Sequence, residues 1–510
     1  MLRNILGGVM LLALVAPANA QTAVAHVTID TSKPGPQIDR HIYGQFTEHL
    51  GRGIYEGIWV GENSKIPNIH GYRKDVVDAL RNIHVPVIRW PGGCFADLYN
   101  WRDGIGPRAK RPVRINVHWG GVTDDNSFGT HEFMNFAELV GADPYVSVNV
   151  GSLTPYDAAQ WVEYMTSDEN ASLANERRKN GRAKPWQLKY LGIGNETWGC
   201  GGNMNGDYAA EVNARYSTFI TAPAAMGMVK VASGATGNGG DPEAFTAAMM
   251  KGGGRLQALS FHYYAMPKGQ PRGPATGFSE AQWANELTLT LKLEDYVSKV
   301  SAVMDKYDPD KKVGLFVDEW GSWYDPEPGS HPGFLYQQNS LRDAEVAALS
   351  LNILQRHTDR VRLAAIAQMV NVLQAMILTD KDKMLLTPTY HVFDMYQSFM
   401  DATPYPATVS GPEYVQGDNH LPMVDVSAAR TKDGKLVLSI VNTNPNHAVQ
   451  VVTNLTGSAH GRIITAIAMD AHNTFDNPNM VHPLPFTSST QDGKMSFDMP
   501  AKGVAVVTVD

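Results

Sequence analysis

The sequence predicts an α/β protein: a (β/α)8 TIM barrel followed by a C-terminal antiparallel, jelly-roll-like β-sandwich. Eight short apolar segments alternate with stretches long enough for a helix, as parallel strands buried on both faces require. After about residue 405, Asp-Gly turns between β-prone runs replace that alternation. With 510 residues, 43% of them hydrophobic and 18% charged, the chain has room for a large domain and a smaller one.

Residues 1–20 have the three parts of a secretory signal peptide. Arg3 is followed by an apolar run over residues 5–15 and then by Ala18-Asn19-Ala20. We expect cleavage before Gln21 and export to the periplasm or the medium. A membrane anchor is the alternative, but about eleven apolar residues are too few to span a bilayer, so no membrane association is expected after cleavage.

Residues 21–40 are expected to contribute a strand to the C-terminal sandwich. Residues 25–30 alternate like an exposed strand and end at the breaker cluster of residues 33–36.

Residues 41–400 are expected to form the barrel. Its eight strand candidates are Ile42–Phe46, Val85–Trp90, Tyr145–Val150, Leu188–Gly194, Val229–Ala232, Ala258–Tyr264, Val313–Trp320 and Ala364–Val370. Residues 401–510 are expected to form the sandwich, because hairpin turns at Asp433-Gly434 and Asp492-Gly493 adjoin β-prone runs.

Charge and cysteine content limit the partners. The formal net charge is −8 and no long Lys/Arg tract occurs, so no nucleic-acid partner is expected. The only two cysteines are Cys94 and Cys200. Each follows a predicted strand at the same end of the barrel, which leaves one disulfide open, but we expect two free thiols with Cys200 as a plain buried one.

Two glutamates stand where a barrel places its active site, at the carboxyl ends of strands. Glu196 follows the fourth strand in Gly194-Asn195-Glu196, and Glu319 ends the seventh. A carboxylate that emerges from an apolar strand needs a partner or a function. Two of them about 5–5.5 Å apart can perform glycoside hydrolysis with retention, one as general acid/base and one as nucleophile.

Several blocks resemble one family more closely. They are residues 42–52 (IYGQFTEHLGR), 88–95 (IRWPGGCF), 99–107 (YNWRDGIGP), 125–129 (DNSFG), 194–202 (GNETWGCGG) and 318–321 (DEWG). In this order, from about residue 27 to the C-terminus, the chain resembles glycoside hydrolase family 51, the α-L-arabinofuranosidases. The resemblance implies a catalytic barrel, a C-terminal β-sandwich and a homo-oligomer.

The resemblance also implies roles at matching positions. Glu196 would be the acid/base and Glu319 the nucleophile. Asn195 would bond the sugar 2-hydroxyl, and Arg89 would lie beside Glu319 and keep it charged. Glu48 would accept a sugar hydroxyl, although an ion pair with Arg52 or His49 is the alternative.

Other candidates in the same pocket are less specific. Tyr264 and His262 are expected to contact the sugar or the nucleophile, or else to be satisfied core residues. At least one of Gln368 and Asn371, amides of the eighth strand, should reach the pocket. Cys94 stands where some relatives carry Asn, which puts a sugar contact there in question. Five tryptophans near strand ends suit either sugar faces or core packing: Trp90, Trp101, Trp198, Trp320 and Trp323.

The leading hypothesis is a retaining exo-hydrolase that removes terminal non-reducing α-L-arabinofuranosyl residues from hemicellulose or pectin fragments such as arabinoxylan or arabinan. It requires no cofactor and no metal. Residues 130–135 begin like a zinc-protease helix, but Asn135 stands where the second histidine is required. The alternatives are a retaining β-xylosidase or endoglucanase on the same scaffold, or a non-catalytic carbohydrate-binding protein.

Overall fold

Eight parallel strands close into a barrel in the computed structural model, which describes residues 23–510. The expected signal peptide lies outside the described residues. In chain order the barrel strands are β2 (Gly44–Phe46), β5 (Val87–Trp90), β8 (Asp143–Val148), β9 (Tyr190–Ile193), β10 (Val229–Thr236), β11 (Ala258–Ala265), β12 (Gly314–Ser322) and β13 (Val361–Ala367). Each overlaps a strand expected from the sequence, so the prediction of a (β/α)8 barrel is confirmed.

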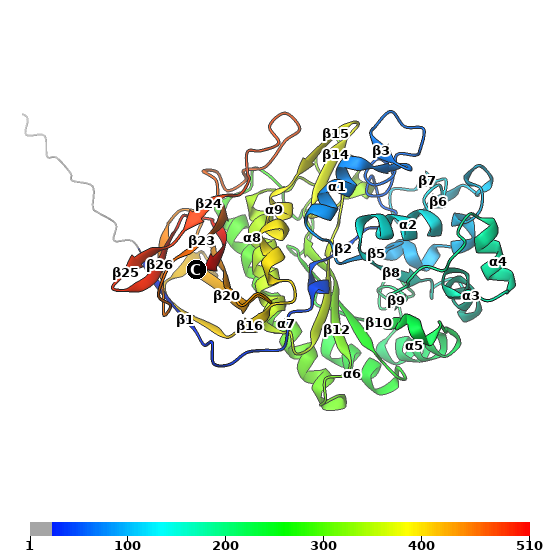
Figure 1. Ribbon diagram of the computed structural model, residues 1–510, viewed down its shortest axis with the longest axis horizontal. Coiled ribbons are helices and arrows are strands. Elements are labelled where there is room, and N and C mark those ends of the chain that lie inside the picture. Colours follow the sequence, from blue (N-terminus) through cyan, green and yellow to red (C-terminus); the bar gives the residue numbers. More distant parts are fainter. Residues whose placement is uncertain (1–22) are drawn as a thin grey trace, which may run out of the picture.

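Helices follow the strands and surround the barrel (Figure 1). They are α1 (Lys74–Asn82), α2 (Thr130–Val140), α3 (Pro155–Thr166), α4 (Ser172–Lys179), α5 (Gly206–Phe219), α6 (Pro242–Gly252), α7 (Glu280–Tyr307), α8 (Leu341–Arg356) and α9 (Pro388–Tyr396). Side-chain caps fix where several of them begin. At α7, for example, the Ser279 hydroxyl accepts from the backbone N–H of Gln282, and the side-chain oxygen of Gln282 accepts from the backbone N–H of Ser279.

The amino-terminal end of the barrel is filled by apolar side chains. One buried cluster takes a residue from seven of the strands: Val87, Tyr145, Tyr190, Val231, Ala258, Phe316 and Leu363. These residues fill the barrel at the amino-terminal ends of its strands. The space for a ligand therefore lies at the carboxyl ends of the strands.

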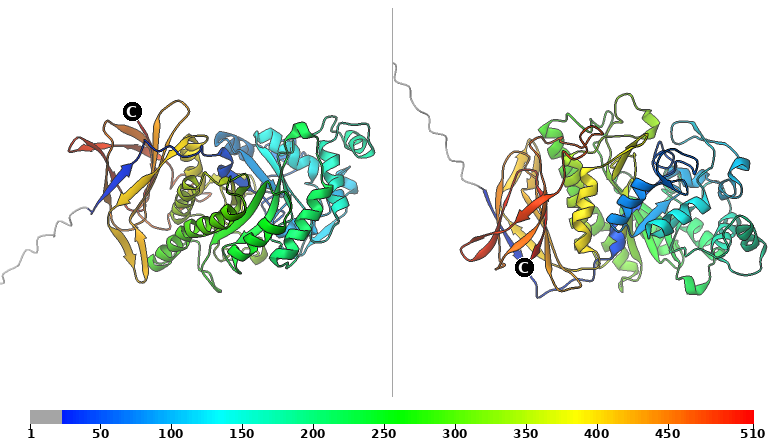
Figure 2. Two further views of the ribbon diagram at one scale, coloured as in Figure 1. Left: turned by 90° about the horizontal axis from the view of Figure 1, so that it is seen from below. Right: turned by 45° about the horizontal axis from the view of Figure 1, so that its top comes forward.

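Two sheets form a sandwich beside the barrel (Figures 1 and 2). One sheet has the order β17 (Ala407–Ser410), β1 (Ala23–Ile29), β22 (Val449–Thr453), β26 (Lys494–Met499) and β25 (Ser489–Gln491). The other has β16 (Thr403–Tyr405), β20 (Val424–Arg430), β21 (Leu436–Asn442), β27 (Val504–Val509), β23 (Ala459–Ile464) and β24 (Leu484–Thr487). Neighbouring strands of the two sheets pair antiparallel except for β1 with β22, where the N-terminal strand joins in parallel.

In the described part of the chain, four short two-stranded hairpins lie in the loops that connect the main strands and helices. They are β3 (Asn68–Ile69) with β4 (Tyr72–Arg73), β6 (Arg114–Asn116) with β7 (Val122–Asp124), β14 (Ile377–Asp380) with β15 (Lys383–Leu386), and β18 (Glu413–Gln416) with β19 (Asn419–Pro422).

Helices α8 and α9 lie between the barrel and the sandwich (Figures 1 and 2). All residues of α8 from Leu341 to Gln355 are buried, as expected of a helix covered on both sides. Two of its polar side chains bond to the parts on either side: Asn352 Nδ2 donates to Asp425 Oδ1 at 2.7 Å, and Gln355 Nε2 donates to the Tyr43 hydroxyl at 2.8 Å.

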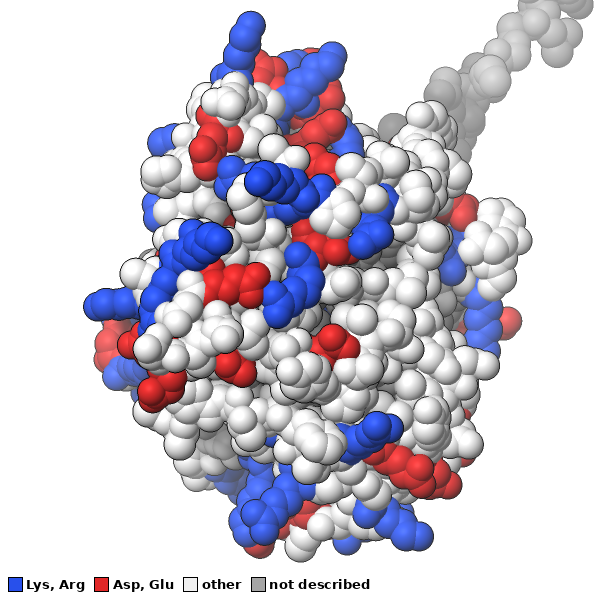
Figure 3. Space-filling view, turned by 90° about the vertical axis from the view of Figure 1, so that its right-hand side faces the viewer, with Lys and Arg blue, Asp and Glu red and all other residues white. Residues whose placement is uncertain are grey.

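Within residues 23–510 no helix is both long and apolar enough to cross a membrane. On the face shown in Figure 3, acidic and basic side chains are interspersed.

Candidate active site

The two predicted catalytic glutamates face each other across the open end of the barrel. Glu319 lies within β12, and Glu196 follows β9 after the chain turns sharply. The turn uses left-handed backbone at Gly194 (φ 79°) and at Glu196 itself (φ 41°). A non-glycine residue pays conformational energy there, which is typical of functional positions.

The separation of the two carboxyl groups matches one of the two known geometries. One oxygen of each, together with a ring nitrogen of His262, lies within 4.8 Å of the others. Retaining glycosidases hold their carboxyl groups about 5–5.5 Å apart, whereas inverting ones leave about 6.5–9.5 Å for a water molecule. The observed spacing fits the retaining class.

Both oxygens of Glu319 are oriented by donors. Arg89 Nη1 donates to Oε1 at 2.7 Å and the Tyr264 hydroxyl donates to Oε2 at 2.9 Å. All three residues are buried. Charge-assisted bonds to both oxygens stabilise a carboxylate and fix its direction.

Arg89 also orients Asn195. Its Nη2 donates to Asn195 Oδ1 at 2.6 Å, so the amide nitrogen is turned toward Gly93 of the pocket lining and lies 3.9 Å from Cys200 Sγ, where it can donate to a sugar hydroxyl. The backbone of Asn195 is held by Asp97, which also accepts from the amides of Val150 and Gly151. Burial raises the pKa of Asp97 to about 7.

Glu196 is held from one side. His262 Nδ1 lies 2.9 Å from Oε1, while the opposite ring nitrogen lies 3.3 Å from Asp318 Oδ1. Burial opposes a charge on His262, but Glu319 and hydrogen bonds with Asp318 and Glu196 raise its pKa to about 10, so both ring nitrogens donate.

The surroundings of Glu196 favour its protonated form. Burial and the nearby charge of Glu319 raise the pKa of Glu196, although the His262 hydrogen bond opposes them. Its Oε2 lies 3.5 Å from Cys200 Sγ. Because that sulfur is disulfide-bonded and carries no hydrogen, Oε2 accepts no hydrogen bond from the described part of the protein and is available to carry a proton.

Glu48 lies on the opposite wall of the pocket. It accepts from the Phe95 amide at 3.0 Å and from Trp119 Nε1 at 2.8 Å, and Gln368 Nε2 lies 3.3 Å from its other oxygen. The alternative partners Arg52 and His49 instead pair with Glu56 and Asp124. Burial raises the pKa of Glu48 to about 7, with the charge of Glu319 adding to the effect.

Glu48, Glu196, Glu319, Tyr264 and Gln368 line a single narrow pocket, whereas Arg89, Asn195 and His262 lie behind its wall. Its volume is about 60 Å³, against 420–520 Å³ for three surface pockets away from the carboxylates. It is lined by Phe46, Glu48, Leu50, Gly93, Cys94, Trp119, Glu196, Tyr264, Glu319, Trp323, Leu335, Gln368 and Leu373. A Cβ on Gly93 would lie 3.2 Å from Glu319 Oε1, so glycine lets this backbone approach the nucleophile closely.

Two expectations from the sequence are corrected. Asn371 does not reach the pocket: its amide nitrogen donates to Arg52 O and Thr379 Oγ1, and its oxygen accepts from the Thr379 amide, because the chain has already turned toward β14. The cysteines are not free. Cys94 and Cys200 form a disulfide with 5.4 Å between their Cα atoms, since the loops after β5 and β9 meet at the pocket.

The tryptophans divide between core and pocket. Trp90, Trp101 and Trp320 are fully buried. Trp323 lines the catalytic pocket and Trp198 lines a neighbouring surface pocket.

Sequence reasoning missed three residues of this site. Trp119 lies in the turn between β6 and β7 and contacts Glu48 from there. No periodic pattern in the sequence predicts this contact. Asp97 lies in a short 3-10 helix. Asp318 was detectable, because it emerges from the same apolar strand as Glu319, and it accepts from the Tyr145 hydroxyl at 2.7 Å.

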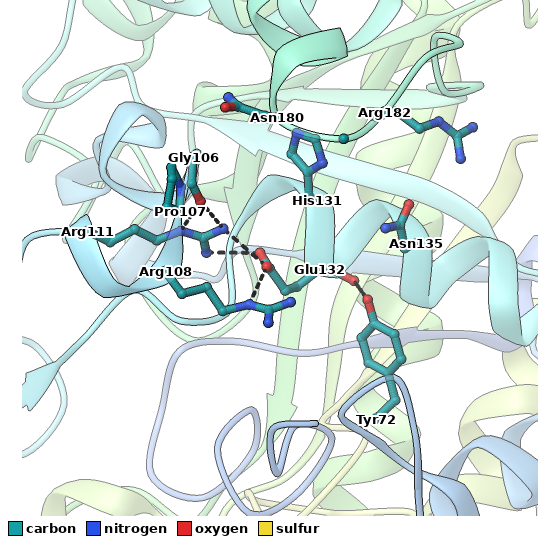
Figure 4. Close-up of a pocket in the computed structure, with 11 residues that line it drawn as sticks. Tyr72, Gly106, Pro107, Arg108, Arg111, His131, Glu132, Asn135, Asn180 and Arg182 are labelled. Atoms are coloured by element: carbon teal, nitrogen blue, oxygen red, sulfur yellow. Dashed lines mark hydrogen bonds and ion pairs between the residues drawn. The ribbon is translucent and has the colours of Figure 1, made fainter. Parts of the chain in front are cut away.

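A separate polar pocket lies around α2 (Figure 4). Its residues His131, Glu132 and Asn135 include the motif that begins like a zinc helix. Arg108 and Arg111 both pair with Glu132, so the charges there are satisfied internally and the pocket has no evident catalytic group.

Two sets of three side chains among the described residues could offer ligands to a metal, each within 4.8 Å: Glu196, His262 and Glu319, and Cys94, Glu196 and Cys200. In the first set a cationic His262 and Arg89 already balance the carboxylates.

Two solved arabinofuranosidase structures resemble this protein over nearly its whole length. A GH51 arabinofuranosidase from Xanthomonas axonopodis pv. citri superimposes with a TM-score of 0.94 at 50% identity, covering 96% of this chain and 100% of that one. An α-L-arabinofuranosidase from Thermotoga maritima, solved as an arabinose complex, gives 0.82 at 30% identity, covering 96% and 100%.

A curated relative corrects the expectation of export. An intracellular exo-α-L-arabinofuranosidase from Bacteroides ovatus is 48% identical over 490 residues, 95% of each chain. Since that relative is named intracellular, the predictions of a signal peptide and of a secreted or periplasmic protein are not supported.

Family comparison gives the same assignment. Residues 79–273 match the α-L-arabinofuranosidase 1 domain, and residues 318–502 match the α-L-arabinofuranosidase C-terminal domain. The second match begins within β12 and so includes the end of the barrel as well as most of the sandwich. On these similarities, and on the barrel that carries paired glutamates, the chain belongs to glycoside hydrolase family 51, the arabinofuranosidases.

Proposed function

We propose that this protein is an exo-acting α-L-arabinofuranosidase that hydrolyses terminal arabinofuranosides with retention, using Glu196 as acid/base and Glu319 as nucleophile. The observation that carries the proposal is the pair of carboxyl groups at the ends of β9 and β12, with oxygens within 4.8 Å of each other and with unequal surroundings. Relatives named arabinofuranosidases support the sugar.

In the first step Glu196 Oε2 donates its proton to the glycosidic oxygen while a Glu319 oxygen attacks the anomeric carbon. The bond to the leaving group breaks, and a covalent glycosyl-enzyme of inverted configuration forms. Asn195, with its amide oriented by Arg89, donates to the 2-hydroxyl, and this bond strengthens as positive charge develops at the sugar ring.

In the second step Glu196, now ionised, removes a proton from water. The water oxygen attacks the anomeric carbon, the ester to Glu319 breaks, and the second inversion restores the original configuration. His262 stabilises the ionised form of Glu196 between the two steps.

The narrow pocket supports exo action. A narrow pocket lined by Phe46, Trp323 and Leu335 favours one terminal sugar over an internal stretch of polymer. Glu48, with Gln368 and Trp119 around it, is proposed to bind hydroxyls of that sugar.

We also propose the division of the chain into a catalytic barrel over residues 41–400, an N-terminal segment 21–40 that joins the sandwich, and a sandwich over 401–510. The family resemblance supports a homo-oligomer, which sedimentation equilibrium would test.

The decisive test is release of 4-nitrophenol from its α-L-arabinofuranoside, with the β-D-xylopyranoside and a β-glucan in parallel. We expect turnover of the arabinofuranoside, its loss in Glu319→Ala, and retention of activity in Glu243→Gln, an exposed glutamate of α6. Turnover of only the xyloside or glucan would overturn the sugar, and no turnover of any would favour a binding protein.

The acid/base role needs its own test. In Glu196→Ala, substrates with good leaving groups should accumulate the glycosyl-enzyme, and azide should rescue turnover by giving the glycosyl azide of retained configuration. An azide product of inverted configuration would mean that Glu196 and Glu319 have exchanged roles.

A further inference from the structure

The disulfide lies beside the proposed general acid. Cys94 follows β5 and lines the catalytic pocket, while Cys200 lies in the loop that carries Glu196. Both cysteines are partly exposed, and Cys200 Sγ is 3.5 Å from Glu196 Oε2. A small reductant can therefore reach the Cys94–Cys200 disulfide from the pocket. A chemical change at the disulfide alters the surroundings of Glu196 Oε2.

The same three side chains form a ligand set for a soft divalent cation. A sulfur of each cysteine and an oxygen of Glu196 lie within 4.8 Å of one another. Zn²⁺ binds thiolate at about 2.3 Å and carboxylate at about 2.0 Å in a tetrahedron, which places two thiolates about 3.8 Å apart. Cα atoms 5.4 Å apart allow that separation after small side-chain rotations.

A second layer of contacts supports this ligand set. His262 bonds Glu196 through Oε1, which leaves Oε2 facing the sulfurs. An outer hydrogen bond of this kind fixes the orientation of a metal ligand. Cys94 and Glu196 line the catalytic pocket, so a water molecule from the pocket can complete the tetrahedron.

We propose that reduction of the Cys94–Cys200 disulfide creates a site for Zn²⁺ or another thiophilic divalent cation, formed by both thiolates and Glu196, and that occupation of this site inhibits the enzyme. A dithiol reductant transfers two electrons and two protons to the disulfide, giving two thiols and the oxidised reductant. Binding of the cation then releases the two thiol protons and the proton of Glu196 to water.

Inhibition follows because an Oε2 that coordinates a cation carries no proton for the leaving group. This half of the inference rests on the proposed role of Glu196. The binding half does not, so the two are measured separately.

Binding is tested with Co²⁺ alone, whose thiolate charge-transfer absorption reports sulfur ligands. Protein treated with a dithiol, freed of it under nitrogen and shown to be folded by circular dichroism, should contain two titratable thiols and bind one Co²⁺ per chain with that absorption. The oxidised protein is the matched control and should show neither. Absence of titratable thiols, unfolding on reduction, or absence of the absorption would overturn the inference.

Two variants locate the ligands. Reduced Glu196→Gln should keep the absorption and bind Co²⁺ at least about tenfold more weakly, since one charged ligand is lost. The double variant Cys94→Ser, Cys200→Ser should lose the absorption. Unchanged affinity in Glu196→Gln would exclude Glu196 from the site.

Inhibition is tested with Zn²⁺, each rate being divided by the rate of the same preparation without metal. Reduced enzyme should lose at least about 90% of its activity at saturating Zn²⁺, as expected if the acid is blocked, and recover it with a chelator. Oxidised enzyme and the double serine variant should not respond. Normal Co²⁺ absorption without inhibition would refute the proposed role of Glu196 and leave the metal site intact.

Discussion

Replacement of Arg89 by lysine tests whether the guanidinium does more than supply a charge. Arg89 donates through Nη1 to Glu319 and through Nη2 to Asn195, and its Nε lies 3.5 Å from Asp318 Oδ2. A lysine ammonium is a single point charge, so it cannot donate to both Glu319 and Asn195 as the two terminal nitrogens of the guanidinium do.

The expected magnitude follows from the bond that is lost. A hydrogen bond with one charged partner contributes about 1.5–3 kcal/mol, and each 1.36 kcal/mol changes a rate tenfold. If lysine keeps the contact with Glu319, Asn195 loses its orientation, and kcat/KM for the 4-nitrophenyl arabinofuranoside should fall by about 10- to 150-fold. The fall should be mainly in kcat, because the 2-hydroxyl contact strengthens in the transition state.

Arg360→Lys is the matched control. Arg360 is equally buried, immediately precedes β13 at the opposite end of the barrel and pairs with Asp308 and Asp305. Its replacement should lower the melting temperature without changing the kcat of the folded enzyme, because the amino-terminal end of a barrel serves stability. A kcat/KM for Arg89→Lys within threefold of wild type, or an equal loss in both variants, would refute the reasoning.

Three further predictions concern charge and contact in and near the pocket. His262→Phe should move the alkaline limb of the kcat/KM pH profile to higher pH, because the His262 hydrogen bond lowers the pKa of Glu196; a move to lower pH contradicts this. Trp119→Phe removes a donor 2.8 Å from Glu48 and should raise KM about tenfold with kcat little changed; a loss confined to kcat would count against a binding role. Burial raises the pKa of Glu286 on α7 to about 8, so the folded state keeps a proton that the unfolded state loses above about pH 4.5. Stability therefore falls as pH rises, and Glu286→Gln should lessen the loss between pH 5 and 7 by about 2–3 kcal/mol in urea unfolding; an unchanged loss would contradict the burial argument.

The fold was predictable because it is encoded locally. Parallel strands buried on both faces must be short and apolar, and this requirement repeats eight times along the chain. The ends of those strands then identify Glu196 and Glu319 as the positions where acidic residues are brought together. Strand boundaries were less exact: β13 ends at Ala367, three residues before the predicted end at Val370.

The remaining site residues depend on how loops pack, which no local pattern records. Gln368 and Asn371 carry the same signal, an amide near the end of an apolar strand, yet only Gln368 faces Glu48. Asn371 has left-handed backbone (φ 60°) and is already part of the turn into β14. The two cysteines are 106 residues apart, and only closure of the barrel brings their loops together.

The unequal surroundings of the two glutamates support the roles proposed for them. Glu319 accepts from Arg89 and Tyr264 on its two oxygens, so both oxygens already have donors directed at them. Glu196 is bonded through Oε1 only, and its Oε2 faces the disulfide and the pocket. A residue that must hold a proton in one step and release it in the next needs such an unbonded oxygen. The geometry thus favours Glu196 as the acid independently of any resemblance, and it explains why a change at the adjacent disulfide would act on protonation before it acts on the nucleophile.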